Sequence, residues 1–170
     1  QIHSAGVICP QQPRRLDSPH QKADAIATNR PDITLFMRFA DCVPVFFYDP
    51  VKRVVAIAHA GWQGTVKNIV ARTVETMQAR FGSQPGDVLA GIGPSIGPDH
   101  YEVGDDVVLA VRGVLGGRSP EVLSRKNGRP RLDLWSTNQI LLEQAGVRRV
   151  EVGRICTACH MPDWYSHRGE

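Results

Sequence analysis

The sequence predicts an α+β (mixed α/β) fold, a layered sandwich in which helices flank a mixed β-sheet. Short β-branched and aromatic runs share the chain with amphipathic helical segments, without the strict strand–helix alternation of a doubly wound parallel sheet. The 170 residues suit one domain with a sizeable core. Hydrophobic residues make up 42% and charged residues 22%, which is ordinary for a globular protein.

Five short apolar runs have the character of strands. They are 33–39, 43–48, 54–58, 88–92 and 149–155. The first two are β-branched and aromatic, and the third is apolar on both parities, which is typical of a strand buried on two faces. Only a short link, 49–53, separates the second run from the third, so these two are expected to form a hairpin.

Helical periodicity is clearest over 65–81. Its apolar stripe consists of Val66, Ile69, Val70, Val74, Met77 and Phe81. Thr65 is expected to cap the start of this helix and Gly82 to end it. Two further helices are expected at 105–115, ending at Gly116, and at 136–145, capped by Ser136 or Thr137 and stopped by Gly146. The proline-containing segment 10–22 is expected to be a loop, and the polar segment 119–131 is expected to be exposed.

Composition narrows the range of functions. The net charge is +3 and the Lys and Arg residues are scattered, which does not favour nucleic-acid binding. The longest apolar run, 43–48, is too short to cross a membrane. Four cysteines without a signal peptide indicate free thiols in the cytoplasm. The chain opens in mid-pattern at Gln1, so residues 1–170 are expected to be one domain that lacks N-terminal and C-terminal segments of a longer protein.

A cysteine and a histidine lie at the ends of two neighbouring expected strands. Cys42 follows the first run, and His59 closes the strand before the Gly61 turn. Such a pair suits either a thiolate nucleophile with a histidine base, or zinc ligation. Zinc needs a third protein ligand, for which His3 is the best candidate. Equally compatible with the spacing is a small buried cysteine beside a hydrogen-bonded histidine.

Two other motifs carry weaker signals. Residues 91–97 (GIGPSIG) follow a strand, but the third glycine is one place late for a dinucleotide fingerprint and Pro94 removes a donor. Residues 156–160 (CTACH) match haem attachment and contain a CxxC pair. Haem needs export and a second axial ligand, a redox CxxC normally opens an early helix, and a second zinc site needs more ligands than Cys9 supplies. We therefore expect Cys156 and Cys159 to be structural or to line a pocket.

The motifs taken together resemble those of a known family. In order they are QIHS (1–4), FADCVPV (39–45), HAGWQG (59–64), IGPSIG (92–97) with YEVG (101–104), LDL (132–134) with Asn138, and CT (156–157) with YSHR (165–168). This series, which runs along the whole chain, resembles the YfiH or laccase-domain family, also called the multicopper polyphenol oxidase family and, more recently, purine nucleoside phosphorylase.

The resemblance implies a compact domain with a metal site at one edge of a mixed sheet. It implies zinc bound by His3, Cys42 and His59. The activity it implies is phosphorolysis of adenosine, inosine and methylthioadenosine, together with deamination of adenosine. Zinc with a vacant position lowers the pKa of a bound water, which suits the deamination. Older descriptions of the family assign copper-dependent oxidation of phenols, so copper is a second candidate metal.

Several residues receive expected roles at the site. Asp41 orients a ligand or relays a proton, unless it is only a turn carboxylate. Arg38, Arg168 and the helix start after Gly61 are candidates to hold phosphate. Trp62 and Tyr101 are candidates to stack on a purine, although core packing is their commoner role.

Three departures from the family pattern bear on these roles. Gln63, which is also expected to bind substrate, stands where the family usually has arginine, so phosphorolysis is expected to be weaker here if that arginine steadies phosphate. Ser95 replaces a frequent cysteine, and the aromatic–arginine ending is altered at 165–168.

Three other functions remain open. A laccase-like oxidoreductase needs many histidines to bind several copper ions. This chain has six histidines, and they provide for only one expected metal site. A metal-free hydrolase would use Cys42 and His59 without His3. A non-enzymatic binding module would give the three residues no reason to meet. The sequence leaves the preferred nucleoside and the oligomeric state open.

Overall fold

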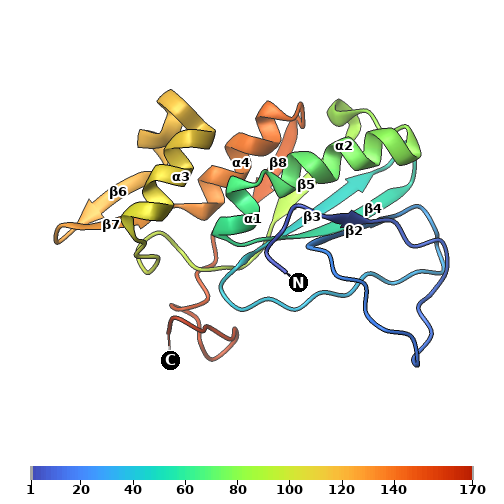
Figure 1. The fold of residues 1–170 in the computed structure, drawn as a ribbon, viewed down its shortest axis with the longest axis horizontal. Coiled ribbons are helices and arrows are strands. Elements are labelled where there is room, and N and C mark those ends of the chain that lie inside the picture. The colour runs from blue at the N-terminus through green and yellow to red at the C-terminus, as the bar shows by residue number, and fades with distance from the viewer. Residues whose placement is uncertain (1, 170) are drawn as a thin grey trace.

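The computed structural model describes residues 2–169, and a six-stranded mixed sheet forms their centre (Figure 1). The strand order is β1-β2-β4-β3-β5-β8. The strands are β1 Val7–Ile8, β2 Ala25–Thr28, β3 Val43–Asp49, β4 Val54–Ala60, β5 Leu89–Ile92 and β8 Arg149–Val152. The β1/β2 and β5/β8 pairs are parallel and the others antiparallel. The mixed α/β fold expected from the sequence is confirmed.

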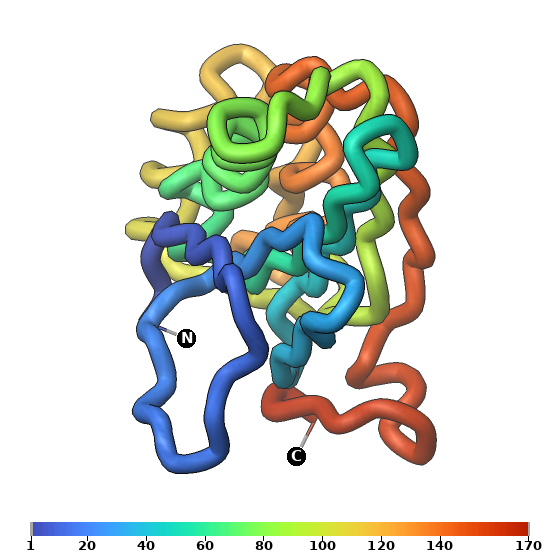
Figure 2. The backbone as a smooth tube through the Cα atoms, turned by 90° about the vertical axis from the view of Figure 1, so that its right-hand side faces the viewer, coloured from blue at the N-terminus to red at the C-terminus, as the bar shows by residue number. Residues whose placement is uncertain are grey.

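The helices pack along one side of this sheet, as Figure 1 shows. They are α1 Trp62–Val66, α2 Ile69–Phe81, α3 Asp105–Leu115 and α4 Leu134–Gln144, with short 3-10 turns η1 Pro85–Asp87 and η2 Gly116–Glu121. Figure 2 shows the N-terminal loop and the C-terminal segment hanging from the opposite side of the sheet. None of the helices formed by residues 2–169 has the length and apolar content to cross a bilayer.

The core lies between the helices and the sheet. Its largest fully buried side chains include Ile69, Met77, Leu134, Leu141 and Leu142. Burying a side chain of this size contributes about 1.5–3 kcal/mol each. The same layer holds β3 and β4 in place, and these two strands carry the candidate site.

The long helix expected over 65–81 is two helices. Asn68 adopts a left-handed conformation with φ 60° and separates α1 from α2. Thr65 is therefore not an N-cap. Its buried hydroxyl donates to the Ala60 carbonyl and accepts from the Asn138 amide, so tertiary contacts use the hydroxyl that a cap would need. Gly82 ends α2 at φ 73°, as expected.

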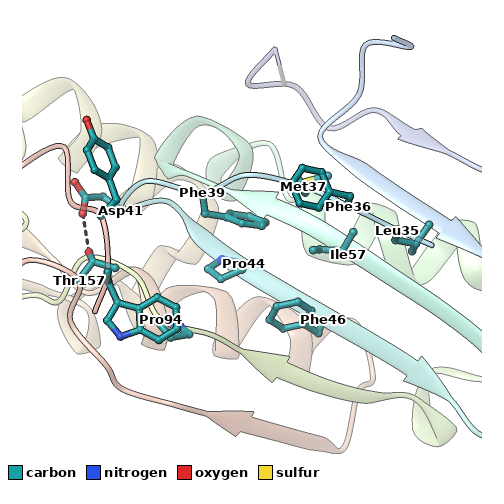
Figure 3. Close-up of a pocket in the computed structure, with 12 residues that line it drawn as sticks. Leu35, Phe36, Met37, Phe39, Asp41, Pro44, Phe46, Ile57, Pro94 and Thr157 are labelled. Atoms are coloured by element: carbon teal, nitrogen blue, oxygen red, sulfur yellow. Dashed lines mark hydrogen bonds between the residues drawn. The ribbon is translucent and has the colours of Figure 1, made fainter. Parts of the chain in front are cut away.

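The run 33–39 is not a strand, contrary to expectation. Its side chains alternate between half-buried and exposed, but no ladder forms. Both candidate partners are already paired on their two edges, β3 with β4 and β5, and β4 with β3 and β2. The run therefore crosses the face of the sheet in extended form, with Leu35, Met37 and Phe39 near Ile57 and Pro44 (Figure 3).

Other differences are local. The polar segment 119–131 is mostly exposed, as expected, and contains a hairpin of β6 Leu123–Lys126 and β7 Arg129–Leu132, as well as part of η2. The short strands β1 and β2 were not expected. The last helix begins two residues early, because the Asp133 carboxylate accepts the Ser136 N–H and caps it in place of Ser136 or Thr137. The loop 10–22 and the β3–β4 hairpin are confirmed.

Candidate functional site

The β3–β4 hairpin brings Cys42 and His59 together. In its register Val43 pairs with Ala60, which places Cys42, one residue before β3, opposite Gly61, one residue after β4. A Cβ placed on Gly61 would lie 2.7 Å from Cys42 Sγ and 3.8 Å from His59 Cε1. The thiol and the imidazole therefore share the space beside Gly61, which only a residue without a side chain leaves open.

His3 completes this arrangement from a distant part of the chain. Its ring centroid lies 5.6 Å from that of His59, at an interplanar angle of 48°. We refer to His3, Cys42 and His59 as the Gly61 cluster. The sequence analysis predicts these three residues as metal ligands. They come from three segments of the chain that meet at one end of the hairpin.

Asp24, which the sequence analysis did not single out, fixes the segment that carries His3. Its carboxylate accepts the backbone N–H groups of Ile2, His3 and Ser4 at 3.0, 3.2 and 2.6 Å. Burial alone would raise the pKa of Asp24, but these hydrogen bonds lower it below its ordinary value. The resulting carboxylate lies 3.8 Å from His59 Nδ1. No spacing rule marks Asp24 in the sequence, since its partners lie about 20 residues away.

His59 is almost completely enclosed. It is 4% exposed, its ring stacks on Phe39 at 5.5 Å, and its Nδ1 has no hydrogen-bond partner. Burial lowers the pKa of His59 to about 4, with the Asp24 charge opposing the shift and His3 reinforcing it. The imidazole is therefore neutral at pH 7. A buried, neutral imidazole with an unused nitrogen fits a metal ligand.

The pKa of the Cys42 thiol is shifted in the opposite direction. Burial raises its pKa to about 11, and the nearby carboxylates of Asp41 and Asp24 add to the effect. A cysteine nucleophile paired with a histidine base needs a thiolate and an imidazolium. The protein surroundings favour the neutral form of both groups, so they do not activate a metal-free Cys–His pair. A bound cation would favour the thiolate.

The Gly61 cluster is wider than a closed metal site. Among residues 2–169, one trio of His, Cys or acidic side chains has ligand atoms that all lie within 4.8 Å of one another, and it is a different one. His3 is exposed and His59 is buried, so the cluster extends from the protein surface to its interior.

Asp41 holds the C-terminal segment against the end of the hairpin. Its buried carboxylate accepts the Thr157 hydroxyl at 2.6 Å, the Ser166 hydroxyl at 2.8 Å and the Arg168 N–H at 2.7 Å. Its backbone is left-handed, with φ 70°. Figure 2 shows the C-terminal segment passing beneath the loop that leads into β3. Thr157 and Ser166 thus position the site, and sequence spacing gave no sign of it.

Three of the residues expected to bind substrate, Trp62, Tyr101 and Arg168, come together. Tyr101 and Arg168 line a pocket of ≈ 660 Å³ with Trp62, and the Arg168 guanidinium lies 5.5 Å from the centre of the Tyr101 ring. Burial raises the pKa of Tyr101 to about 12, and Cys42 contributes to the shift. Arg38 is exposed on the extended run, and Gln63 is half-buried in the first turn of α1. The expected phosphate-binding helix start belongs to a helix of only five residues, whose peptide dipoles add up to little.

A second, apolar pocket of ≈ 370 Å³ lies on the other face of the sheet (Figure 3). Its walls include Phe36, Phe39, Phe46 and Trp164, and Asp41 and Thr157 close one end. The sequence analysis assigned no function to these aromatic residues, of which Phe36, Phe39 and Phe46 lie in the expected strand runs 33–39 and 43–48.

The trio with close ligand atoms is His100, Cys156 and Cys159. The ligand atoms of this group are close enough together to hold a metal ion. His100 was missed because it lies 56 residues before Cys156, at no recognisable spacing. All four cysteines are free thiols, as a reducing compartment would keep them, and the cytoplasmic location stays a prediction.

Comparison with known proteins places these residues in context. Residues 1–170 match the family model described as multi-copper polyphenol oxidoreductase laccase. The chain is 41% identical over 147 residues to purine nucleoside phosphorylase YlmD of Bacillus subtilis, covering 85% of this chain and 53% of that protein. It is 39% identical over 168 residues to a purine nucleoside phosphorylase of Deinococcus radiodurans, covering 99% and 62%. It is 34% identical over 177 residues to adenosine deaminase RL5 of an unknown prokaryotic organism, covering 99% and 67%.

Solved structures agree with the fold. The crystal structure of hypothetical protein YfiH from Bacillus licheniformis superimposes with a TM-score of 0.92 at 37% identity, covering 99% of this chain and 67% of that one. YlmD from Geobacillus stearothermophilus gives 0.89 at 32%, covering 99% and 66%. The chain thus corresponds to one continuous part of longer relatives.

Proposed function

Because this chain belongs to the multi-copper polyphenol oxidoreductase laccase family, we propose that it carries the metal centre of a purine nucleoside phosphorylase that also deaminates adenosine. Adenosine, inosine and methylthioadenosine are the proposed substrates, with phosphate as the second substrate. The names of the relatives support both reactions. The chain spans only 53–62% of the two phosphorylases, so the activity is proposed for the whole protein.

The observation that carries this proposal is the meeting of three distant side chains beside Gly61. Cys42 and His59 are held by the hairpin register, and His3 by the Asp24 carboxylate. His59 Nδ1 is buried without a partner, and Gly61 leaves the room that a side chain would fill. His, Cys and His form a donor set that suits zinc, with a vacant fourth position. We therefore propose these three residues as the zinc ligands.

When bound, zinc at this position would supply a Lewis acid that lowers the pKa of water towards 7. The chain's own residues do the rest. Phe39 covers the His59 ring and excludes water from that side. Asp41 acts as a positioning residue, because its carboxylate is engaged by the C-terminal segment.

The pocket beside Tyr101 is the proposed substrate site. Its aromatic side chains, Trp62 and Tyr101, offer flat surfaces for a purine, and Arg168 offers a cation for phosphate. Arg38 and Gln63 line neither described pocket. We keep them as candidates whose contribution depends on the rest of the protein.

Incubation of the full-length protein with adenosine, with and without phosphate, tests the proposal. Chromatography separates adenine and ribose phosphate from inosine, so each reaction is measured independently. His59→Ala and Cys42→Ser should lose the zinc of the Gly61 cluster and both activities. Their matched controls are His20→Ala and Cys9→Ser, which change the same residue types outside the Gly61 cluster and should keep both. A wild-type protein that binds zinc and forms neither product would refute the function.

A copper-dependent phenol oxidase is the second candidate, favoured by the family description and by the second trio of metal-ligating residues. Multicopper chemistry needs many more histidine ligands than these two groups supply, since together they contain three of the six histidines, His3, His59 and His100. Metal analysis of protein purified without added copper, together with a phenol-oxidation assay, distinguishes the two. Copper in place of zinc, with phenol turnover, would favour the oxidase.

A further inference from the structure

The loops that follow β5 and β8 bring together a group of metal-ligating side chains that are not among the proposed zinc ligands, although His100 also lines the pocket beside Tyr101. His100 Nδ1 lies 3.6 Å from Cys156 Sγ and 3.6 Å from Cys159 Sγ. All three ligand atoms lie within 4.8 Å of one another. From this geometry we infer that His100, Cys156 and Cys159 form a second zinc site, separate from the Gly61 cluster.

The distances are those of a metal site. Zinc–sulfur bonds of about 2.3 Å and zinc–nitrogen bonds of about 2.0–2.1 Å, at a tetrahedral angle, separate sulfur from nitrogen by about 3.6 Å. Both S···N distances in this group have that value, so an ion can enter with little movement of the side chains. Two thiolates and one imidazole are soft and borderline donors, which suit zinc better than magnesium or calcium.

The surroundings of Cys156 hold its side chain in a fixed position, as is common for metal ligands. Its side chain is buried, and its sulfur accepts the Gly97 N–H at 3.2 Å. A backbone donor to a ligand sulfur orients the ligand and offsets its negative charge. Gly97 has no room for a side chain, since a Cβ there would lie 3.1 Å from Cys156 Cβ and 3.0 Å from the Trp135 ring. The close approach of the two loops at this point therefore depends on a glycine.

The ion would join two loops that already touch. Ser95 and Cys156 form an isolated parallel bridge, with hydrogen bonds of 3.1 Å from Ser95 N to Ile155 O and from Thr157 N to Ser95 O. His100 lies on the first loop, and the CxxC turn lies on the second. Because His100 and Cys159 are exposed, an ion bound by this group would be accessible to solvent, which could supply a fourth ligand. The site thus fastens the loop before Tyr101 to the loop that contains Thr157.

Counting ions on the full-length protein tests this inference. The reduced, metal-free chain is titrated with zinc against a chromophoric chelator. Wild type should bind two ions, Cys159→Ala one, Cys42→Ala one and the double variant none. Cys9→Ala, the matched control, should bind two. Loss of a ligand should weaken the second ion by more than about 100-fold, since removing even an outer-shell partner costs about 10- to 100-fold.

Hydrogen exchange supplies a local readout. Zinc should slow amide exchange over 95–103 and 155–161 in wild type and in Cys42→Ala, but not in Cys159→Ala. Cys159 is exposed, so its replacement leaves the fold intact. Unchanged zinc stoichiometry in Cys159→Ala would overturn the second site, and so would a Cys156–Cys159 disulfide in place of the ion. A single ion that Cys42→Ala abolishes would do the same and leave the proposed function standing.

Discussion

Adding one methyl group at Gly61 should disable the Gly61 cluster without unfolding the protein. The backbone there has φ −66° and ψ 171°, which alanine adopts freely, so Gly61→Ala introduces no backbone strain. The new Cβ would lie 2.7 Å from Cys42 Sγ. Comfortable contacts of this kind are about 3.5–4.0 Å, so the sulfur must move by about 1 Å.

Such overpacking costs about 1–3 kcal/mol. If this cost destabilises the zinc-bound protein but not the metal-free protein, the zinc affinity of the cluster falls about 5- to 150-fold, because about 1.4 kcal/mol corresponds to a factor of ten. Zinc titration gives the affinity, and urea unfolding of the metal-free protein gives the stability. Gly113→Ala is the matched control, because nothing lies within 4 Å of its Cβ in α3 and it should stabilise the helix by about 0.5–1 kcal/mol.

A double-mutant cycle separates the contact with sulfur from other effects. In a Cys42→Ala background the sulfur is gone, so Gly61→Ala should destabilise the metal-free protein less than it does in wild type. An equal cost in both backgrounds, or zinc affinity that Gly61→Ala leaves unchanged, would show that Gly61 does not hold room for the thiol.

Further predictions concern stability. Leu142 is fully buried, so Leu142→Ala should lower the free energy of unfolding by about 2–5 kcal/mol in urea titration, whereas Leu16→Ala, at a site 95% exposed, should change it by less than about 0.5 kcal/mol. Thr157→Val removes a hydrogen bond to the Asp41 carboxylate and should lower the free energy of unfolding by about 1.5–3 kcal/mol. Amide exchange over 160–169 should become faster in this variant. Exchange as slow as in wild type would show that Thr157 does not hold the C-terminal segment against Asp41. Burial alone would raise the pKa of Asp49, but the nearby Ser83 side chain, the hydrogen bonds from the backbone N–H groups of Val51 and Lys52 and the Lys52 charge lower it. A lowered folded-state pKa gives stability that is present above the unfolded-state value and is lost as the pH falls through the folded-state value. Asp49→Asn should therefore flatten the loss of stability between pH 5 and 2, measured by urea unfolding at each pH, and a slope equal to that of wild type would contradict the assignment.

Local sequence patterns correctly predicted those helices and strands whose tertiary contacts are compatible with the patterns. The β3–β4 hairpin, α3 and the end of α2 at Gly82 follow from short-range chemistry: apolar strand residues, a helical stripe and a left-handed glycine. The short link between the strands also determined that Cys42 and His59 would lie side by side. These features depend on residues that are near one another in the chain.

Only the tertiary structure decided how the remaining segments are used. The run 33–39 has the pattern of a strand, but β3 and β4 have no free edge to receive it. Thr65 has the identity of a cap, but Asn138 and the Ala60 carbonyl engage its hydroxyl. Asp24, Asp41 and His100 act on partners 20 to 127 residues away. Composition and spacing do not encode such contacts, because packing of the whole chain brings these groups together.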